Sequence, residues 1–229
     1  MSARDESEAW NRGTQEWVAR IRSGMGGRVH AHDASLDELL PPPRGLTLDV
    51  GCGEGRVSRE LRTRGYDVVG FDGSETLVGE ARAADPSGRY EVARIDALPV
   101  GDASAELAVC INVVPHVHDL AGAARELARV LAPGGVLVVG TIHPVAQAGE
   151  YDEEADELRL RGYFERKPHA VPLGEYEVHH RHRTIEDYVR TFHGAGLRLT
   201  DLREVPGPTG SVPLYLDLAF ERPEPVRAS

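Results

Sequence analysis

The chain has 229 residues, a length that fits one domain with a core large enough to need no disulfide framework. Its formal net charge of −11 argues against a long nucleic-acid substrate, because binding a phosphate backbone requires a positive surface. No apolar run is long enough to cross a membrane and no signal segment opens the chain, so we expect a protein of the reducing cytoplasm, in which both cysteines stay free.

The N-terminal segment predicts two helices before the first strand. Apolar residues recur at helical spacing between Glu6 and Arg22, and Trp10 and Trp17 are among them. Leucines between positions 36 and 40 predict a second, shorter helix, which the three prolines at 41–43 end.

A strand, a glycine turn and a helix follow one another between Leu46 and Gly65. Leu46–Val50 predicts a buried strand, alternating glycines follow it, and Arg56–Arg64 predicts a helix that stops at Gly65. This order brings bare backbone and a helix N-terminus up to a ligand. A nicotinamide dinucleotide fingerprint would need a glycine at position 56, where the chain has Arg56, so the spacing disfavours that cofactor.

The centre of the chain alternates between predicted strands and predicted helices. The strands are 46–50, 67–71, 90–95, 106–111 and 136–142, and the helices are 56–64, 74–84 and 120–131. Such alternation predicts an α/β fold with a doubly wound parallel sheet and helices on both faces. Because ligands bind beyond the carboxyl ends of parallel strands, five polar residues are expected at one edge. These residues are Asp49, Asp72, Asp96, Asn112 and His143.

Residues 143–183 interrupt the alternation. They hold an acidic run at 150–157 and two short predicted strands at 158–164 and 175–181. A charged run is usually a solvated face, but an insertion at the ligand edge is typical of a substrate lid. A helix at 185–193 and strands at 197–205 and 213–221 are predicted to complete the chain.

The pattern D-x-G-x-G-x-G from Asp49 to Gly55 resembles the first motif of the class I S-adenosylmethionine-dependent methyltransferases of the small-molecule type. Four further segments resemble later motifs of that family in the right order: 68–72, 94–97, 105–112 and the R-x-L-x-P-G-G segment 129–135. The resemblance implies a Rossmann-like, mostly parallel seven-stranded sheet with an antiparallel final strand pair. It also implies a helical cap over the cofactor.

The resemblance implies S-adenosylmethionine as the cofactor and S-adenosylhomocysteine as the product. Asp72 is then expected to bind the ribose hydroxyls; the alternative, a helix cap, is weaker because Ser74 is available for it. Asp96 is expected at the adenine amino group, and a simple turn acid is the alternative. Asp49 and the Gly51 amide are expected at the amino-acid end. The remaining expected cofactor-binding residues are Cys52, Gly53, Gly55, Gly73, Ala97, Leu98, Asn112 and Val113.

Histidines at the ligand edge are the candidates for acid–base chemistry. His116 follows the fourth strand and His143 follows the fifth, and plain packing is the alternative role of each. His179, His180 and His182 form a cluster in the insertion. A polar lid strand is favoured over a metal site there, because no acid or cysteine has matching spacing.

The predicted function is methyl transfer to an O, N or C atom of a small organic acceptor, for example in specialised metabolism. The alternatives are methylation of a protein or RNA, and cofactor binding without turnover. The expected partner is a small-molecule acceptor, with no nucleic acid and no membrane, and a homodimer stays open. The single domain 1–229 divides into a cap (1–43), a cofactor half (44–142), a lid (143–183), a C-terminal helix and strand pair (184–222) and a tail (223–229).

Overall fold

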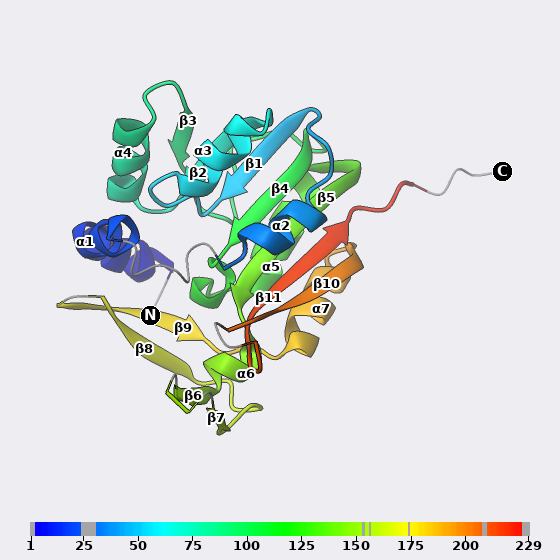
Figure 1. Ribbon diagram of the computed structural model, residues 1–229. Helices are drawn as coiled ribbons and strands as arrows, with labels where there is room; N and C mark the ends of the chain where they lie inside the picture. Colours follow the sequence, from blue (N-terminus) through cyan, green and yellow to red (C-terminus); the bar gives the residue numbers. More distant parts are fainter. Residues whose placement is uncertain are drawn as a thin grey trace.

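A computed structural model describes residues 3–23, 31–152, 154–155, 157–173, 175–207 and 210–225. Its centre is a seven-stranded sheet in the order β10-β11-β5-β4-β1-β2-β3 (Figure 1). The strands are β1 (Leu46–Val50), β2 (Asp67–Asp72), β3 (Arg89–Val92), β4 (Ala105–Ile111), β5 (Leu131–Ile142), β10 (Arg198–Pro206) and β11 (Pro213–Glu221). In this sheet of the described chain, β11 pairs antiparallel with both β10 and β5, and the other four strand pairs are parallel. The predicted mostly parallel, Rossmann-like sheet is confirmed.

Helices pack on both faces of the sheet through separate apolar clusters. Helices α2 (Asp33–Leu39) and α3 (Arg56–Thr63) pack on one face, where Leu39 and Leu61 are buried. Helices α5 (Leu120–Val130) and α7 (Ile185–Gly194) pack on the other face, and α4 (Glu75–Ala84) packs against β2 and β3. In the view of Figure 1, α2 lies in front of the sheet. Burial of both faces fixes the strand register that delivers the loops to one edge.

The turn between β1 and α3 depends on glycine. Gly51, Gly53 and Gly55 have φ angles of 79°, 55° and 86°, in the left-handed region that other residues adopt only with strain. The amides of Gly51 and Cys52 both donate to the Phe71 carbonyl, which ties the turn to β2. The predicted strand, glycine turn and helix are therefore confirmed.

The N-terminal helix α1 (Ala3–Arg22) lies across the carboxyl edge of the sheet. It is joined to α4 by polar contacts: Ser74 Oγ donates to Asn11 Oδ1 at 2.7 Å, and the hydroxyls of Thr14 and Thr76 lie 2.5 Å apart. On its other side α1 packs against the hairpin strands of the insertion.

The insertion holds more regular structure than expected. Besides α6 (Pro144–Gln147), it forms two hairpins, which pair β6 (Gly149–Asp152) with β7 (Glu157–Leu160) and β8 (Pro168–Leu173) with β9 (Tyr176–Arg181). The predicted strand at 158–164 is wrong beyond Leu160, and β8 is missing from the prediction. Its prolines at 168 and 172 disfavour a central strand, but a two-stranded hairpin has only edge strands, which tolerate proline.

Two element boundaries of the cofactor half also differ from expectation. β3 ends at Val92 rather than at position 95, because Arg94 to Ala97 form a turn in which the Ala97 amide donates to the Arg94 carbonyl at 3.0 Å. β5 begins at Leu131, so the proline–glycine–glycine turn lies within its first residues. Of the expected tail, residues 226–229 lie outside the described residues. No helix in the described ranges has the length and apolarity to span a membrane.

Candidate cofactor and acceptor site

A cavity of about 290 Å³ opens beyond the carboxyl ends of β1, β2 and β4. Helix α1 contributes Ser7, Trp10 and Trp17 to its wall. The sheet edge contributes many of the residues expected from sequence: Gly51, Gly53, Asp72, Gly73, Asp96, Asn112 and Val113. Residues that follow β1, β2, β3 and β4 therefore meet at one cavity, as the topology of parallel strands predicts.

Asp72 is held rigidly at the end of β2. Its carboxylate accepts hydrogen bonds from the Gly53 amide at 2.9 Å and from the Ser74 amide at 2.8 Å. Burial raises the pKa of this carboxyl, and the two amides oppose that effect. Ser74, not Asp72, caps α4 through the Leu77 amide, which removes the structural alternative for Asp72. Both oxygens keep lone pairs that suit ribose hydroxyls.

Part of the wall of this cavity is apolar. Ala93 and Ile95 line it together with Leu77 and Val117, which offers a planar base an apolar slot. Arg94 Nε donates to Asp96 at 2.8 Å, and this bond lowers the pKa of the carboxyl. Asp96 thus lies at the cavity but is engaged by its neighbour.

Three residues expected at the cofactor line neither cavity of the site. Gly55 precedes α3, and a Cβ there would lie 3.0 Å from the Tyr90 ring, so it permits close packing of helix and strand. Leu98 is buried in the core and its amide donates to Glu126 at 2.7 Å. Ala97 closes the turn after β3.

A second cavity, of about 700 Å³, adjoins the first. The two share Trp10, Trp17, Gly51, Gly53, Ile111, Asn112 and His116. The second extends from Asp49 and Cys52 at the glycine turn to Gln147 on α6 and to the inner faces of β8 and β9. The insertion therefore covers the second cavity, where a substrate lid was expected.

Asn112 lines both cavities, and Asp49 lines the second one beside the glycine turn. Asp49 is buried and accepts the Ser58 hydroxyl at 2.6 Å, and burial raises the pKa of its carboxyl to about 6. Asn112 has a φ of 58°, in the left-handed region, and its amide donates to the Gly140 carbonyl at 2.7 Å. Both residues suit the charged amino-acid end of a cofactor.

His116 faces both cavities. Its ring packs edge-to-face with Trp10 at 5.0 Å and with His180 at 4.6 Å. Burial lowers the pKa of this imidazole to about 3, so the ring is neutral at physiological pH. Its Nδ1 is buried and has no hydrogen-bond partner among the described residues. The neutral ring borders the site, and such a ring suits hydrogen bonding better than strong base catalysis.

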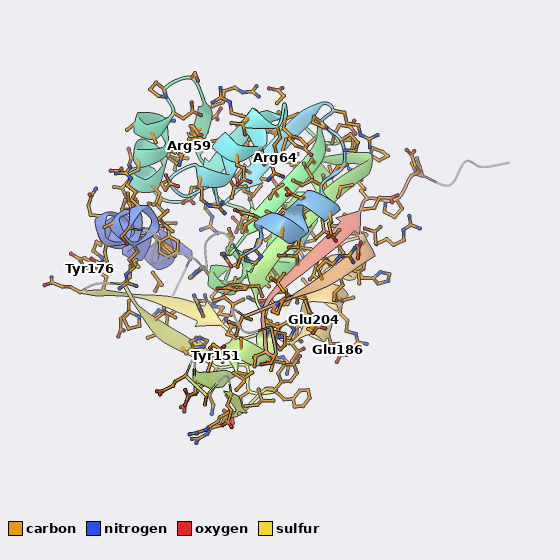
Figure 2. All side chains as sticks on the ribbon, viewed as in Figure 1. Arg59, Arg64, Tyr151, Tyr176, Glu186 and Glu204 are labelled. Carbon is orange, nitrogen blue, oxygen red and sulfur yellow. The ribbon has the colours of Figure 1, made fainter. Side chains whose placement is uncertain are left out.

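His143 has a different environment. It is buried and lines neither cavity; its Nδ1 accepts the Val145 amide at 3.1 Å, and its Nε2 lies 3.0 Å from Glu204. Glu204, a residue of β10, is labelled in Figure 2. These contacts make His143 the cap of α6, so the structure does not bring it together with the other candidates.

The histidine cluster of the insertion is divided between environments. His180 faces the second cavity and stacks edge-to-face on His169 of the paired strand at 5.4 Å, whereas His182 turns to the Tyr163 carbonyl at 2.7 Å. No group of three metal-binding side chains is arranged for a metal ion within the described residues. The aromatic pair on α1 and Gln147 are wall residues for which the sequence suggested only a cap or no role.

Comparisons with known proteins agree with this geometry. The family model described as "Methyltransferase domain" matches residues 48–139. The chain is 32% identical over 171 residues to a ubiquinone biosynthesis O-methyltransferase of Sinorhizobium fredii, covering 72% of this chain and 65% of that protein. It is 37% identical over 113 residues to the malonyl-[acyl-carrier protein] O-methyltransferase of Salmonella typhimurium, covering 49% of this chain and 45% of that protein.

A solved structure is similar over most of the fold. The crystal structure of an S-adenosylmethionine-dependent methyltransferase from Mesorhizobium loti superposes with a TM-score of 0.73 at 25% identity, covering 84% of this chain and 98% of that chain. The present chain spans less than two thirds of the length of the two curated relatives named above. With its seven-stranded sheet, its glycine turn and these matches, the chain belongs to the class I S-adenosylmethionine-dependent methyltransferase family.

Proposed function

We propose that the protein binds S-adenosylmethionine in the first cavity and methylates a small organic acceptor in the second. The observation that carries this proposal is the junction of the two cavities at Gly51, Gly53 and Asn112, beside the motif residues. When bound, the cofactor supplies an activated methyl group that a lone pair of the acceptor displaces, leaving S-adenosylhomocysteine.

Different residues of the chain bind different parts of the cofactor. Asp72 binds the ribose hydroxyls, and the open backbone of Gly53, where a Cβ would meet nothing within 4 Å, lets the cofactor approach. Asp49 and Asn112 hold the ammonium and carboxylate end near the N-terminus of α3. Alignment of donor and acceptor then supplies much of the rate enhancement.

A small acceptor is supported by the way the second cavity is enclosed. Trp10 and Trp17 of α1 pack against Leu173 of the β8–β9 hairpin, and together with His180 they form a continuous wall of the cavity. The net charge of −11 disfavours a long polyanionic substrate. The relative named for ubiquinone biosynthesis agrees with an O-methyl transfer to a small molecule. We propose that residues 143–183 form a lid that excludes water during transfer.

A carrier-bound acyl group is the second candidate acceptor, because one relative is named for malonyl-[acyl-carrier protein]. Incubating the protein with S-adenosylmethionine and a panel of acceptors, and measuring S-adenosylhomocysteine, separates the candidates. Turnover with free small molecules supports the proposal, whereas turnover only with carrier-linked acyl groups favours the second candidate. Calorimetric binding of NADH in place of S-adenosylhomocysteine would contradict both.

A further inference from the structure

The charged groups in the wall of the second cavity already have partners. They gather at the glycine turn and on α1, where Arg20 also donates to the Pro172 carbonyl of β8 at 3.2 Å. The pairs are Arg20 with Glu16 at 3.2 Å, Glu54 with Arg59 at 2.8 Å, Arg56 with Asp33 at 3.1 Å and Asp49 with Ser58 at 2.6 Å. Three of these pairs are ion pairs, so an anionic acceptor would find a counter-charge only by breaking one of them. The partner of Asp49 is an uncharged hydroxyl, and this carboxylate is assigned above to the ammonium group of the cofactor.

The three imidazoles of the wall add no charge. His116, His180 and His169 stack edge-to-face in a row, with ring centroids 4.6 and 5.4 Å apart. Burial lowers the pKa of His116 to about 3 and that of His180 to about 4, and it also lowers the pKa of His169. The row is therefore a neutral aromatic surface at pH 7.

The rest of the lid side of the cavity is apolar or aromatic. Its members come from α1, β5, α6, β8, β9 and β11. They are Trp10, Trp17, Ile142, Ala146, Val171, Leu173, Val178, Leu214 and Tyr215. Such walls favour a ligand that buries apolar ring surface.

Two polar groups of the wall lack partners. Both amide atoms of Gln147 are buried without a hydrogen-bond partner in the part of the chain that the structure describes, and the same holds for Nδ1 of His116. A hydrogen bond between His116 and the His179 backbone raises the pKa of the ring, as expected for a ring N–H that donates to a carbonyl. Nδ1 is then left as an acceptor. Buried unpaired groups are costly, so a ligand that pairs with them gains affinity.

We propose that the acceptor of this cavity is an uncharged, ring-bearing molecule with a neutral hydroxyl group, which Gln147 and Nδ1 of His116 bind. This inference rests on the proposed function, because it assigns the second cavity to the acceptor. The hydroxyl donates to Nδ1 of His116 or to the amide oxygen of Gln147, and accepts from the amide nitrogen. Carboxylates and amines are disfavoured, because the arginines of the wall are already paired and the Asp49 carboxylate is assigned to the ammonium group of the cofactor.

The two tryptophans provide a readout other than activity. The chain contains two tryptophans, and both line the cavity. The protein is saturated with S-adenosylhomocysteine and then titrated with 4-propylphenol, propylbenzene, 4-propylbenzoate and 4-propylbenzylamine. Tryptophan emission is excited at the red edge of the absorption band, where the probes do not absorb. At neutral pH the phenol is uncharged, the benzoate is anionic and the amine is cationic.

The expected order of affinity is the phenol first, propylbenzene about tenfold weaker, and the two ions weaker still, since one well-formed hydrogen bond is worth about tenfold. Gln147→Leu should remove most of the preference for the phenol over propylbenzene. Gln15→Leu is the matched control, because Gln15 is exposed on α1 and pairs with Glu80. It should leave the preference unchanged.

Tighter binding of the benzoate or the amine than of the phenol would overturn the assignment, and so would binding of none of the four. A preference for the phenol that survives in Gln147→Leu would show that Gln147 does not bind the hydroxyl group. S-adenosylhomocysteine affinity, measured separately by calorimetry, isolates the proposed function. If that ligand fails to bind, the methyltransferase proposal fails; if it binds and an ion is preferred, only the acceptor class fails.

Discussion

The first cavity takes most of its wall from the ends of consecutive strands between β1 and β4, whereas the second draws on segments as distant as α1, α6, β9 and β11. In the first, the Asp72 carboxylate is fixed by backbone amides, whereas the second gathers both tryptophans, three imidazoles and aliphatic side chains of the insertion beside the charged residues of the glycine turn. A donor that is the same throughout a family needs a fixed polar frame, and an acceptor that differs between members needs a wall that can be rebuilt. The predictions below test this division.

The largest effect is expected from Asp72→Ala. Loss of the carboxylate removes the partner of the ribose hydroxyls and of the Gly53 and Ser74 amides, so affinity for S-adenosylhomocysteine should fall about 100-fold or more. Calorimetry measures the affinity and circular dichroism checks the fold. Asp67→Ala is the control, because Asp67 lies exposed at the start of the same strand. This variant should bind S-adenosylhomocysteine with unchanged affinity. Unchanged affinity in Asp72→Ala would show that the fixed carboxylate of the first cavity does not hold the cofactor.

Asp49→Asn should separate stability from binding. The folded protein holds the Asp49 proton up to about pH 6, while the unfolded carboxyl releases it near 3.8, so folding stability falls as the pH rises between these values. At pH 7 the variant should gain about 2 kcal/mol of unfolding free energy, without that pH dependence. Urea unfolding at pH 4 and pH 7 measures this. Cofactor affinity should fall about tenfold; a variant that is neither more stable nor weaker in binding contradicts this role.

Gly51→Ala and Gly53→Ala form a matched pair within one turn. A Cβ at Gly51 would lie 2.2 Å from Val113 Cγ2, whereas one at Gly53 would meet nothing within 4 Å; both positions have positive φ. Gly51→Ala should therefore lose about 2 kcal/mol of stability or more, and Gly53→Ala about 1 kcal/mol. Thermal unfolding measures the difference. Equal losses would show that the contact with Val113 relaxes without cost.

The smallest effect is expected from His143→Asn. The substitution keeps a capping side chain on α6 but loses the contact with Glu204, so stability should fall by about 0.5 to 1 kcal/mol. Affinity for S-adenosylhomocysteine should not change, because His143 lines neither cavity. Retained methyl transfer would agree with the capping role. Loss of turnover with normal folding would restore His143 as a candidate for catalysis.

Prediction from sequence succeeded where the signal is local. The glycine turn and Asp72 lie in one short stretch, whose alternation of strand, turn and helix specifies the sheet and the edge at which ligands bind. Prediction was less complete where tertiary packing determines the position of a strand or a side chain. Pro168 and Pro172 concealed β8, and the position of His143 after β5 gave no sign that its ring turns into the cap of α6. Gln147 belongs to no motif, because its importance comes from the apolar walls around it.

The two tryptophans of α1 couple the opening of one cavity to the opening of the other. Trp10 and Trp17 stand on a single helix, face each other edge-on at 5.4 Å and border both cavities. Any swing of α1 that uncovers one cavity also uncovers the other. S-adenosylhomocysteine and the methylated product are therefore expected to leave through the same opening. A cross-link between α1 and α4 should slow the release of both.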